Sequence, residues 1–447
     1  MTALLETSQL EERAALLVEA AKTAGADKAD AIAVRGSSLS VDVRNGAVEE
    51  IDRSEGDDFT LRVFVGDKTA SVSTNAFDTV REVAERAVSM AKFVPDDPYA
   101  GFLDAALRAS VFDNLDLVDG TIRTAEELTE FAREAEDIAR SVDGVTASIG
   151  ASASWGVGGM ALVTSDGFSG SYLRSRFSHS ASVIAGEGTS MERDGDYDMR
   201  THASDLRSPA DVGKTAGERT VKRLNPSKTP STTATVVYEN RVASSLLGHL
   251  ASAINGAAIA RGTSFLKSRM GEQIFRPDIQ ISDQPRLRRR LGSRPFDGEG
   301  GRAEDMMLVA DGILTSWTLD SATARELGLT PNGRASRGGS GTSPSTTNLT
   351  MLPGTVSFEE AIAGIENGIL VTDLIGQGTN LVTGDYSRGA AGFKIENGKI
   401  TTPVSEITIA GNLTDMFARL VPCNDLEIRG STNAPSIVID GMTIAGT

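Results

Sequence analysis

Several residue types are scarce in this 447-residue sequence, and each scarcity excludes a class of protein. Cys423 is the single cysteine, so the chain has neither a disulfide framework nor a zinc site built from several thiolates. Histidine occurs only as His179, His202 and His249, which limits catalytic triads and metal sites. No apolar run approaches the ~20 residues that a membrane-spanning helix needs, so we expect no membrane partner.

Positive charge is scarce relative to negative charge. The chain has 44 Lys and Arg against 61 Asp and Glu, a net charge of -17. Such a surface repels polyphosphates, so a nucleic-acid partner is not expected, and the one basic run, 286–294, is typical of an exposed loop. Residues 1–17 carry acids where a signal peptide has basic and then apolar residues, which indicates a cytoplasmic, bacterial-type protein.

Two proline-containing segments divide the chain into three predicted units. Residues 95–98 (PDDP) and 226–230 (PSKTP) are typical of linkers between packed segments. The predicted units are an N-terminal α+β domain at 1–98, a central α+β domain at 99–228 and a β-rich C-terminal domain at 229–447. The expected fold class is therefore α+β, with antiparallel sheets and helices in the two mixed α/β N-terminal units.

The two N-terminal units share one pattern of helix and strand signals. A Ser8–Glu11 capping box begins a helix that ends at Gly25, and a Thr124–Glu127 box begins another helix in the second unit. The other expected elements are strands at 39–43 and 59–65 around an Asn45-Gly46 turn, a helix at 77–91, strands at 145–153, 160–164 and 168–185 with a hairpin at Asp166-Gly167, and a helix at 209–223.

The C-terminal unit is rich in turn signals. An apolar helix is expected at 242–260, and the Gly/Ser/Thr-rich segment 332–348 predicts a mobile surface loop. Asp or Asn followed by Gly predicts hairpins at Asp311-Gly312, Asn397-Gly398 and Asp440-Gly441.

Motifs for nucleotide binding are incomplete. Gly213-Lys214-Thr215 ends like a phosphate-binding loop, but Ser208 stands where the first glycine of that loop is needed. Gly376-Gln377-Gly378 has Leu381 in place of the third glycine of a dinucleotide-binding motif. We interpret the first as a solvated helix surface and the second as a turn that enters a strand.

None of the three histidines has the sequence neighbours of a catalytic or metal site. His179 and His202 lie in polar segments without a second histidine or an acid at helical spacing. His249 lies on an apolar helix that carries no acid, so we interpret it as a hydrogen-bonded core residue.

A glycine-rich stretch near the C-terminus is the most unusual feature. Glycine within strand-rich sequence marks a bulge or a close approach of another backbone, so the stretch is either a tightly turned sheet or a contact surface for a peptide or subunit. The predicted contact residues are Gly376, Gly378, Gly384, Asp385, Tyr386, Ser387, Arg388, Gly389 and Gly392.

Long blocks of the sequence resemble the TldD/PmbA family, once described as modulators of DNA gyrase. The resemblance covers nearly the whole chain and is strongest to the PmbA branch, also called TldE. It implies a subunit of a heterodimeric cytoplasmic metalloprotease that takes extended, unstructured peptides, including toxin–antitoxin and microcin-precursor substrates. The blocks are VRNGAVEEID (43–52), 239–266, RPFDGEG (294–300), DGILTSW (311–317), GDYSRGAAGF (384–393) and PVSEITIAGNL (403–413).

The chain departs from the family at the expected metal site. The resemblance implies that a TldD-type subunit binds zinc through H-E-x-x-x-H on a helix and a later cysteine. Here Gly248 replaces the first histidine, His249 the glutamate and Ala253 the second histidine, while Cys423 falls near the cysteine position. We therefore expect no metal and no catalytic residue in this chain, with the zinc held by a TldD-type partner.

Three functions stay open on the sequence alone. The first is a non-catalytic protease subunit that contacts the partner and helps to form the substrate chamber. The second is an independent metallopeptidase built around His249 and Cys423 with an acid such as Asp385. The third is a non-enzymatic, gyrase- or DNA-associated modulator. A homodimer in the absence of the partner is a further alternative.

Overall fold

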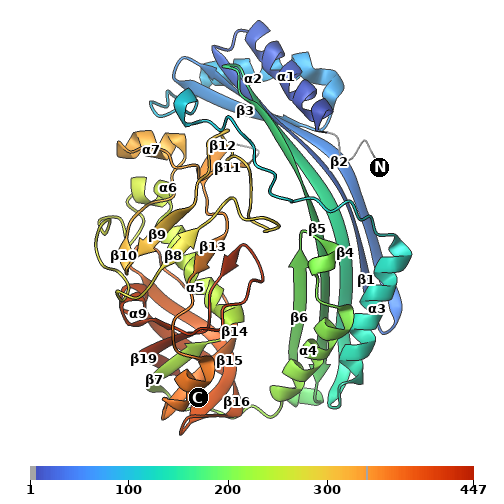
Figure 1. Cartoon of the computed structure of the whole chain (residues 1–447), viewed down its shortest axis with the longest axis vertical. Coiled ribbons are helices and arrows are strands. Elements are labelled where there is room, and N and C mark those ends of the chain that lie inside the picture. The colour runs from blue at the N-terminus through green and yellow to red at the C-terminus, as the bar shows by residue number, and fades with distance from the viewer. Residues whose placement is uncertain (1–6, 339–340, 447) are drawn as a thin grey trace.

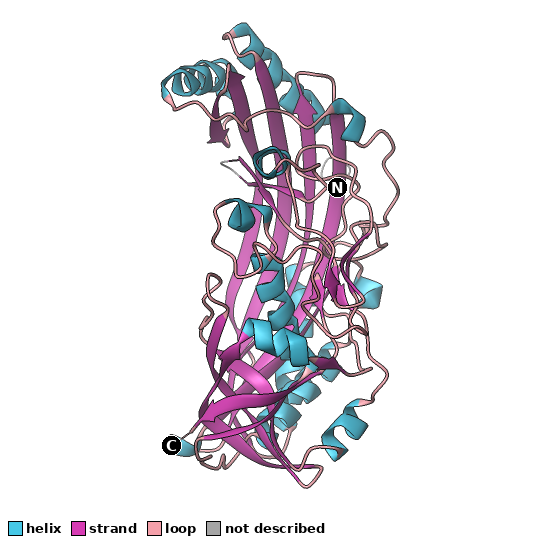
Figure 2. Cartoon of the chain, turned by 90° about the vertical axis from the view of Figure 1, so that its left-hand side faces the viewer, coloured by secondary structure: helices cyan, strands magenta, loops and turns pink. Residues whose placement is uncertain are grey.

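A long, bent sheet runs the length of the molecule, and the C-terminal half of the chain lies beside it (Figure 1). The computed structural model describes residues 7–338 and 341–446. Figure 2, which looks onto the C-terminal half, shows the long strands running behind it from end to end. The mixed α+β architecture that the sequence predicts is confirmed. Within the described residues, no helix is both long and apolar enough to cross a membrane.

The long sheet is antiparallel and combines the first two predicted units. Its order is β3-β2-β1-β4-β5-β6, and β1 pairs with β4 from Asp30 opposite Thr164 to Val43 opposite Ala151. The sequence predicted strands in each unit but not this pairing between units. The strands are β1 (Lys28–Arg44), β2 (Ala47–Val65), β3 (Lys68–Thr74), β4 (Val145–Thr164), β5 (Ser169–Ala185) and β6 (Glu192–Arg200).

Four helices cover one face of this sheet, two at each end. Ala31 of β1 packs with α1 (Ser8–Thr23) and α2 (Val80–Phe93), and Val41 packs with α3 (Ala125–Ser141). Helix α4 (Pro209–Lys222) lies against α3 and β5. Because strand side chains alternate between faces, Ile32 points to the opposite face, where it meets Phe296 of the C-terminal half.

Local signals in the N-terminal units are mostly confirmed. Thr124 makes the predicted capping box with Glu127, and Asn45 and Gly46 both have positive φ, as a tight hairpin turn requires. The Ser8 box is wrong: helix α1 begins at Ser8 itself, after Thr7, and no side chain caps it. Short 3₁₀ turns lie at Phe77–Thr79, Ala105–Leu107, Gly188–Ser190 and Ala203–Asp205.

The C-terminal half contains a mixed sheet that closes on itself. Its order is β16-β15-β14-β7-β19-β17, and β16 also pairs with β19. The strands are β7 (Thr232–Tyr238), β14 (Asn367–Ile375), β15 (Asp385–Glu396), β16 (Lys399–Asn412), β17 (Val421–Pro422) and β19 (Ile437–Ala445).

Smaller elements complete this half around a main apolar core and a second, smaller cluster that includes Ile362 and Leu370. The helices are α5 (Asn240–Ala253), α6 (Gly256–Ala260), α7 (Ser321–Leu327), α8 (Phe358–Ala363) and α9 (Leu413–Arg419). A second sheet, ordered β10-β9-β8-β13-β18, is formed by β8 (Ile281–Asp283), β9 (Met306–Ala310), β10 (Ile313–Leu314), β13 (Leu349–Met351) and β18 (Thr432–Asn433).

Two predictions for this half need correction. Asp440-Gly441 is not a hairpin: it lies inside β19, where the register against β7 shifts and Gly441 has a positive φ, so the dipeptide forms a bulge. The helix predicted at 242–260 is two helices, because Asn255 leaves the helical conformation and its side chain caps α6. The hairpins at Asp311-Gly312 and Asn397-Gly398 are confirmed.

The segment 332–348 is not a mobile loop over its described residues. It forms a hairpin of β11 (Ala335–Gly338) and β12 (Gly341–Pro344), and Gly339 and Ser340 lie outside the described residues. Arg334 is fully buried, and Arg337 makes an ion pair with the buried Asp30 of β1. The two arginines anchor a segment whose small polar composition suggested mobility.

The two halves contact each other at both ends of the long sheet. At one end Phe296 packs against Ile32, Leu162 and Phe168. At the other end Asp194 of β6 pairs with Arg241 of α5 at 2.8 Å. Between these contacts, a groove of about 640 Å³ lies over the sheet, and glycines and serines form much of its lining: Gly36, Ser38, Ser54, Gly156 and Gly158.

Candidate functional site

Helix α5 carries Gly248, His249 and Ala253, the positions at which the sequence departs from the expected metal-binding motif. It follows β7 after one residue and buries Leu246, Leu247 and Leu250 in the C-terminal core. Gly248 is exposed on the other side of the helix, and His249 lies half-buried between these two environments. The apolar residues at helical spacing thus fix the orientation of α5 and place His249 at the edge of the core.

The structure brings His249 together with the glycine-rich stretch. Its Nε2 lies 3.3 Å from Oγ1 of Thr379, and its ring meets Tyr386 edge-on with centroids 5.8 Å apart. Burial, and secondarily the Arg388 guanidinium, lower the pKa of His249, so the imidazole is neutral at neutral pH. We call His249, Thr379, Tyr386 and Arg388 the α5 polar cluster.

Tyr386 connects this cluster to a second buried tyrosine, Tyr238, in the core. Burial raises the pKa of Tyr386, while the nearby Tyr238 hydroxyl and Arg388 lower it. Burial also raises the pKa of Tyr238 well above its usual value, and its hydroxyl lies 3.6 Å from Sδ of Met442. The cluster therefore consists of neutral or cationic groups and contains no carboxylate that could serve as a general base.

Several glycines of the stretch are required by close backbone contact. A Cβ on Gly378 would lie 1.5 Å from the Ser387 carbonyl oxygen, and a Cβ on Gly392 would lie 1.8 Å from that of Leu370. Gly376 and Gly384 have positive φ, and a Cβ on Gly389 would lie 3.2 Å from Cβ of Ile375. These glycines are explained by the tightly turned sheet, one of the two interpretations of the stretch. Contact with a substrate or partner stays a prediction.

The polar members of the stretch have different surroundings. Asp385 is exposed and accepts a hydrogen bond from Thr383 at 2.6 Å and from Asn412 at 3.3 Å. The Ser387 amide donates to the Gly378 carbonyl at 2.7 Å. Tyr386 is buried and Arg388 is half-buried beside it. Gly376 lines the groove of about 940 Å³ between the central unit and the C-terminal sheet.

The residues at the expected metal positions do not fit a zinc ion. Gly248 offers no ligand atom, Ala253 is apolar and fully buried, and the two positions lie in different environments. Cys423 is buried, and its burial together with Asp425 and Glu359 raises its pKa to about 12, so the thiol is protonated in the metal-free chain. Among residues 7–338 and 341–446, no three His, Cys, Asp or Glu side chains are grouped as metal ligands.

Sequence reasoning missed residues that only the fold brings near the site. Thr379 was passed over within the glycine-rich stretch, and Tyr238 was passed over as a residue of a buried strand. Away from the site, the ion pair between Asp30 and Arg337 that joins the two halves links residues 307 positions apart. No local signal links them, although RPFDGEG did stand out as a family block.

Comparisons with known proteins cover the whole chain. Residues 29–91, 121–224 and 231–446 match domain 1, the central domain and the C-terminal domain of the PmbA/TldA metallopeptidases. Metalloprotease PmbA of Escherichia coli O157:H7 is 37% identical over 98% of both chains. The metalloprotease PmbA homolog of Haemophilus influenzae is 36% identical over 100% of this chain and 98% of the relative.

Solved structures share the fold over the same length. A candidate modulator of DNA gyrase from Bacteroides thetaiotaomicron superimposes with a TM-score of 0.90 at 27% identity, covering 99% of this chain and 100% of that one. TldE from Thermococcus kodakarensis has a TM-score of 0.86 at 18% identity, covering 97% of this chain and 100% of that one. At that identity, the second likeness bears on the fold alone.

Proposed function

The chain belongs to the PmbA/TldD metallopeptidase family, and from this premise we propose that it is the non-catalytic, TldE-like subunit of a heterodimeric metalloprotease. In this proposal the zinc and the general base belong to a TldD-type partner, and the complex hydrolyses extended, unstructured peptides in the cytoplasm. A homodimer would be a resting form that lacks the catalytic ion.

The donor chemistry at α5 carries the proposal. A hydrolytic zinc needs several nitrogen, sulfur or oxygen ligands and an open position for water. Position 248 is a glycine, position 253 a buried alanine, and His249 faces Thr379 and Arg388 instead of an acid. Restoring one ligand would leave the others missing.

The grooves support a role in holding a peptide. Extended peptides are recognised mainly through their backbone, which needs a surface that another backbone can approach closely. The 640 Å³ groove over the long sheet has a glycine and serine lining, and the 940 Å³ groove contains Gly376 and the exposed Ile375. This chain would then orient the substrate while the partner supplies the reaction.

The proposal is tested by separating the two subunits. We expect the pure chain to contain far less than one zinc per molecule by mass spectrometry and to leave a fluorogenic unstructured peptide intact. Co-expression with the TldD-type protein encoded in the same genome should yield a 1:1 complex with peptidase activity and about one zinc per complex.

Matched variants assign the zinc within the complex. Replacing the glutamate of the partner's H-E-x-x-x-H motif by glutamine should abolish hydrolysis with the complex intact, whereas Cys423→Ser here should leave kcat within about twofold. Stoichiometric zinc with peptide hydrolysis in the pure chain, or loss of zinc from the complex in Cys423→Ser, would overturn the proposal.

A further inference from the structure

Two arginines line one side of the 640 Å³ groove over the long sheet. Arg174 and Arg176 are two positions apart on β5, so they project from the same face of the sheet, roughly 7 Å from each other along the strand. Tyr172 projects from this face as well and packs edge-on against Phe296 of the C-terminal half. The β5 arginine pair, as we call Arg174 and Arg176, therefore faces the C-terminal half of the chain.

Most of the hydrogen-bonding capacity of this pair is unused. Nη2 of Arg174 donates to the Ser293 carbonyl, and Nε of Arg174 is buried without a partner, so the groove is reached through Nη1. Arg176 is exposed, and among residues 7–338 and 341–446 it has neither a hydrogen bond nor an ion pair. Several N–H groups of the pair are thus available to a ligand.

The positive charge of the pair is not balanced by a nearby carboxylate. Burial lowers the pKa of Arg174, and the guanidinium groups of Arg176 and Arg294 lower it as well, whereas Tyr172 raises it. Arginine stays protonated at neutral pH, so these cations repel one another. Within the described lining of the groove, the carboxylate is that of Asp58 on β2, three strand spacings or roughly 14 Å across the sheet. The pair is therefore suited to a ligand that brings negative charge.

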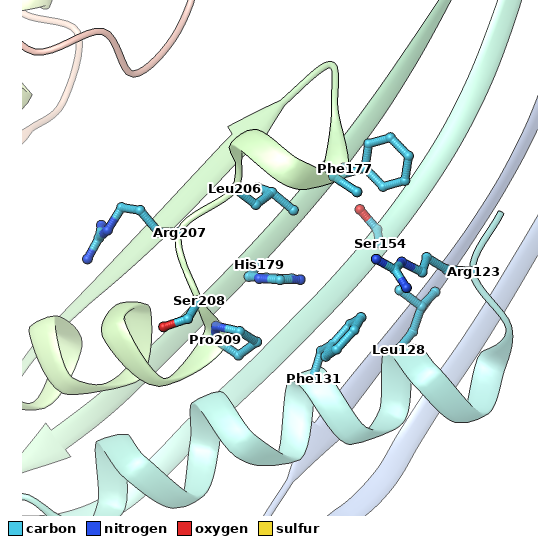
Figure 3. Close-up of a pocket in the computed structure, with 11 residues that line it drawn as sticks. Arg123, Leu128, Phe131, Ser154, Phe177, His179, Leu206, Arg207, Ser208 and Pro209 are labelled. Carbon is cyan, nitrogen blue, oxygen red and sulfur yellow. The ribbon is translucent and has the colours of Figure 1, made fainter. Parts of the chain in front are cut away.

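Other arginine-lined hollows differ, because their arginines are paired. The cavity of about 190 Å³ around His179, on the helix-covered face of the sheet, has Arg123 and Arg207 at opposite ends of its lining (Figure 3). Arg123 pairs with Glu127 at 3.0 Å, and Arg207 pairs with Asp196 at 2.5 Å. The β5 arginine pair has no such partner among the described residues.

A row of glycines leads across the floor of the groove to this pair. Gly56, Gly36 and Gly158 are opposite one another on β2, β1 and β4, and Arg174 continues the row on β5. A Cβ on Gly36 or Gly56 would have no atom within 4 Å, so the packing of the fold does not require glycine there. Glycine weakens the interior of a strand but allows another backbone to approach closely. The floor is therefore open to an extended chain.

From this arrangement, and resting on the proposed function, we propose that Arg174 and Arg176 bind a carboxylate of the peptide substrate, whose backbone lies over Gly36 and Gly158. A carboxylate accepts two hydrogen bonds from one guanidinium, or one from each of two, and such charge-assisted bonds are stronger than neutral ones. The carboxylate belongs either to the C-terminus of the peptide or to an acidic side chain. The groove thus selects for negative charge as well as for an extended backbone.

Other ligands agree less well with the groove. An amine or another cation would be repelled by both guanidinium groups. A nucleic acid would have to approach a chain with a net charge of -17. A free inorganic anion would satisfy the arginines but would leave the glycine floor unoccupied. A carboxylate attached to an extended chain uses both features.

The test compares peptides that differ in one group. We would titrate the full chain at pH 7.5 and low salt with an acetylated heptapeptide of glycine, alanine and serine, either as the free acid or as the C-terminal amide, and measure binding by calorimetry. We expect the free acid to bind about tenfold or more tightly than the amide, because a hydrogen bond to a charged group exceeds a neutral one. Equal affinities, or no binding of the free acid at millimolar concentration, would overturn the proposal.

Variants locate the binding. Arg176→Gln should reduce the preference for the free acid, and the exposed position of Arg176 keeps the risk of misfolding small. Arg81→Gln removes the same charge from α2, outside the groove, and should keep the preference. Gly36→Val should weaken binding of both peptides without lowering the melting temperature, because its Cβ meets open space. A preference unchanged in Arg176→Gln, or binding unchanged in Gly36→Val, would overturn the proposal.

A further arm identifies the source of the carboxylate. If an amidated heptapeptide with a central aspartate binds as tightly as the free acid, the pair recognises acidic side chains, whereas weak binding of this peptide assigns it to the C-terminus. Both results support a carboxylate site. Binding of inorganic phosphate without binding of either peptide would instead assign the pair to free anions and overturn the proposal.

These measurements use the isolated chain and do not depend on hydrolysis. A failure of the carboxylate preference would therefore leave the assignment of the zinc to the partner untouched. Conversely, stoichiometric zinc and hydrolysis in the pure chain would overturn the subunit role without changing the comparison of free acid with amide. The two proposals can fail separately.

Discussion

Gly248 and Gly378 show how differently one residue type can constrain the chain. Gly248 lies inside α5 with no atom within 4 Å of the place where a Cβ would be, so nothing in the fold requires its small size. Gly378 lies where its Cβ would overlap the Ser387 carbonyl. The sequence could indicate that a glycine-rich stretch contains close contacts, but not which glycines make them.

This contrast gives a prediction at the residue scale. Gly248→Ala should raise the free energy of unfolding by ~0.5–1 kcal/mol, because alanine loses less backbone entropy in an exposed helix. Gly378→Ala should lower it by ~1–3 kcal/mol, the usual cost of overpacking. Urea unfolding followed by circular dichroism measures both. Two changes of the same sign would contradict this account of the stretch.

Elements whose start and end depend on local chemistry were predicted well. The Thr124 capping box and the Asn45-Gly46 and Asn397-Gly398 turns need only residues a few positions apart. Elements that depend on distant partners were not. The hairpin β11–β12 has the composition of a loop, and its order comes from Asp30, which lies about 300 positions away in the sequence. The bulge at Asp440-Gly441 likewise depends on β7.

The hairpin prediction concerns Arg337. Burial alone would raise the pKa of Asp30, but Arg337 and Arg62 together hold it below its usual value. Removing one partner of a buried ion pair costs ~3–5 kcal/mol, and Arg62 remains 2.6 Å from Asp30, so we expect Arg337→Ala to cost about 3 kcal/mol. Limited proteolysis should then cleave near residues 335–344.

Arg302→Ala provides the control for this prediction. Arg302 pairs with Glu304 at 3.1 Å, but both side chains are more than half exposed, so the loss should stay below ~1 kcal/mol. If Arg337→Ala behaves like Arg302→Ala in urea unfolding and proteolysis, the ion pair with Asp30 does not order the hairpin.

At the scale of the whole molecule, the sequence predicted the α+β class and the family, and the structure adds how the halves join. The contacts between them combine Phe296 and Arg337 with strands of the long sheet. The helix that carries His249 and the glycine-rich stretch were both identified in the sequence, and the structure shows that they are in contact. The cavity at His179 could not be identified, because its lining comes from separate segments of the chain.

The stability of the chain should respond to pH through the buried Glu299. Burial, and then Asp297, raise the pKa of Glu299 from 4.5 to about 7, although the Ser321 amide and hydroxyl donate to it at 2.9 and 2.8 Å. The folded chain then binds more protons than the unfolded chain between these pKa values. Its stability is therefore highest below pH 4.5 for this group and falls as pH rises through about 7, by up to about 3 kcal/mol.

Glu299→Gln tests this linkage. The amide keeps an oxygen that can accept from Ser321 but does not ionise, so the variant should be more stable than the original chain at pH 8 and should show a smaller loss between pH 5 and 8. Exposed Glu304→Gln should follow the original chain. Parallel pH profiles of the melting temperature for the original chain and Glu299→Gln would refute the assignment.

The pairing of β1 with β4 has a practical consequence for anyone who wishes to study pieces of this protein. An expression fragment that stops near residue 98 would keep β1 paired with β2 but would expose the edge of β1 that pairs with β4 from Asp30 to Val43, and an exposed strand edge can pair with other chains. A nick or an insertion near residue 98 leaves β4 in place, so the edge of β1 stays paired. This position is therefore suited to circular permutation or labelling, whereas cutting the chain into separate fragments there would favour aggregation.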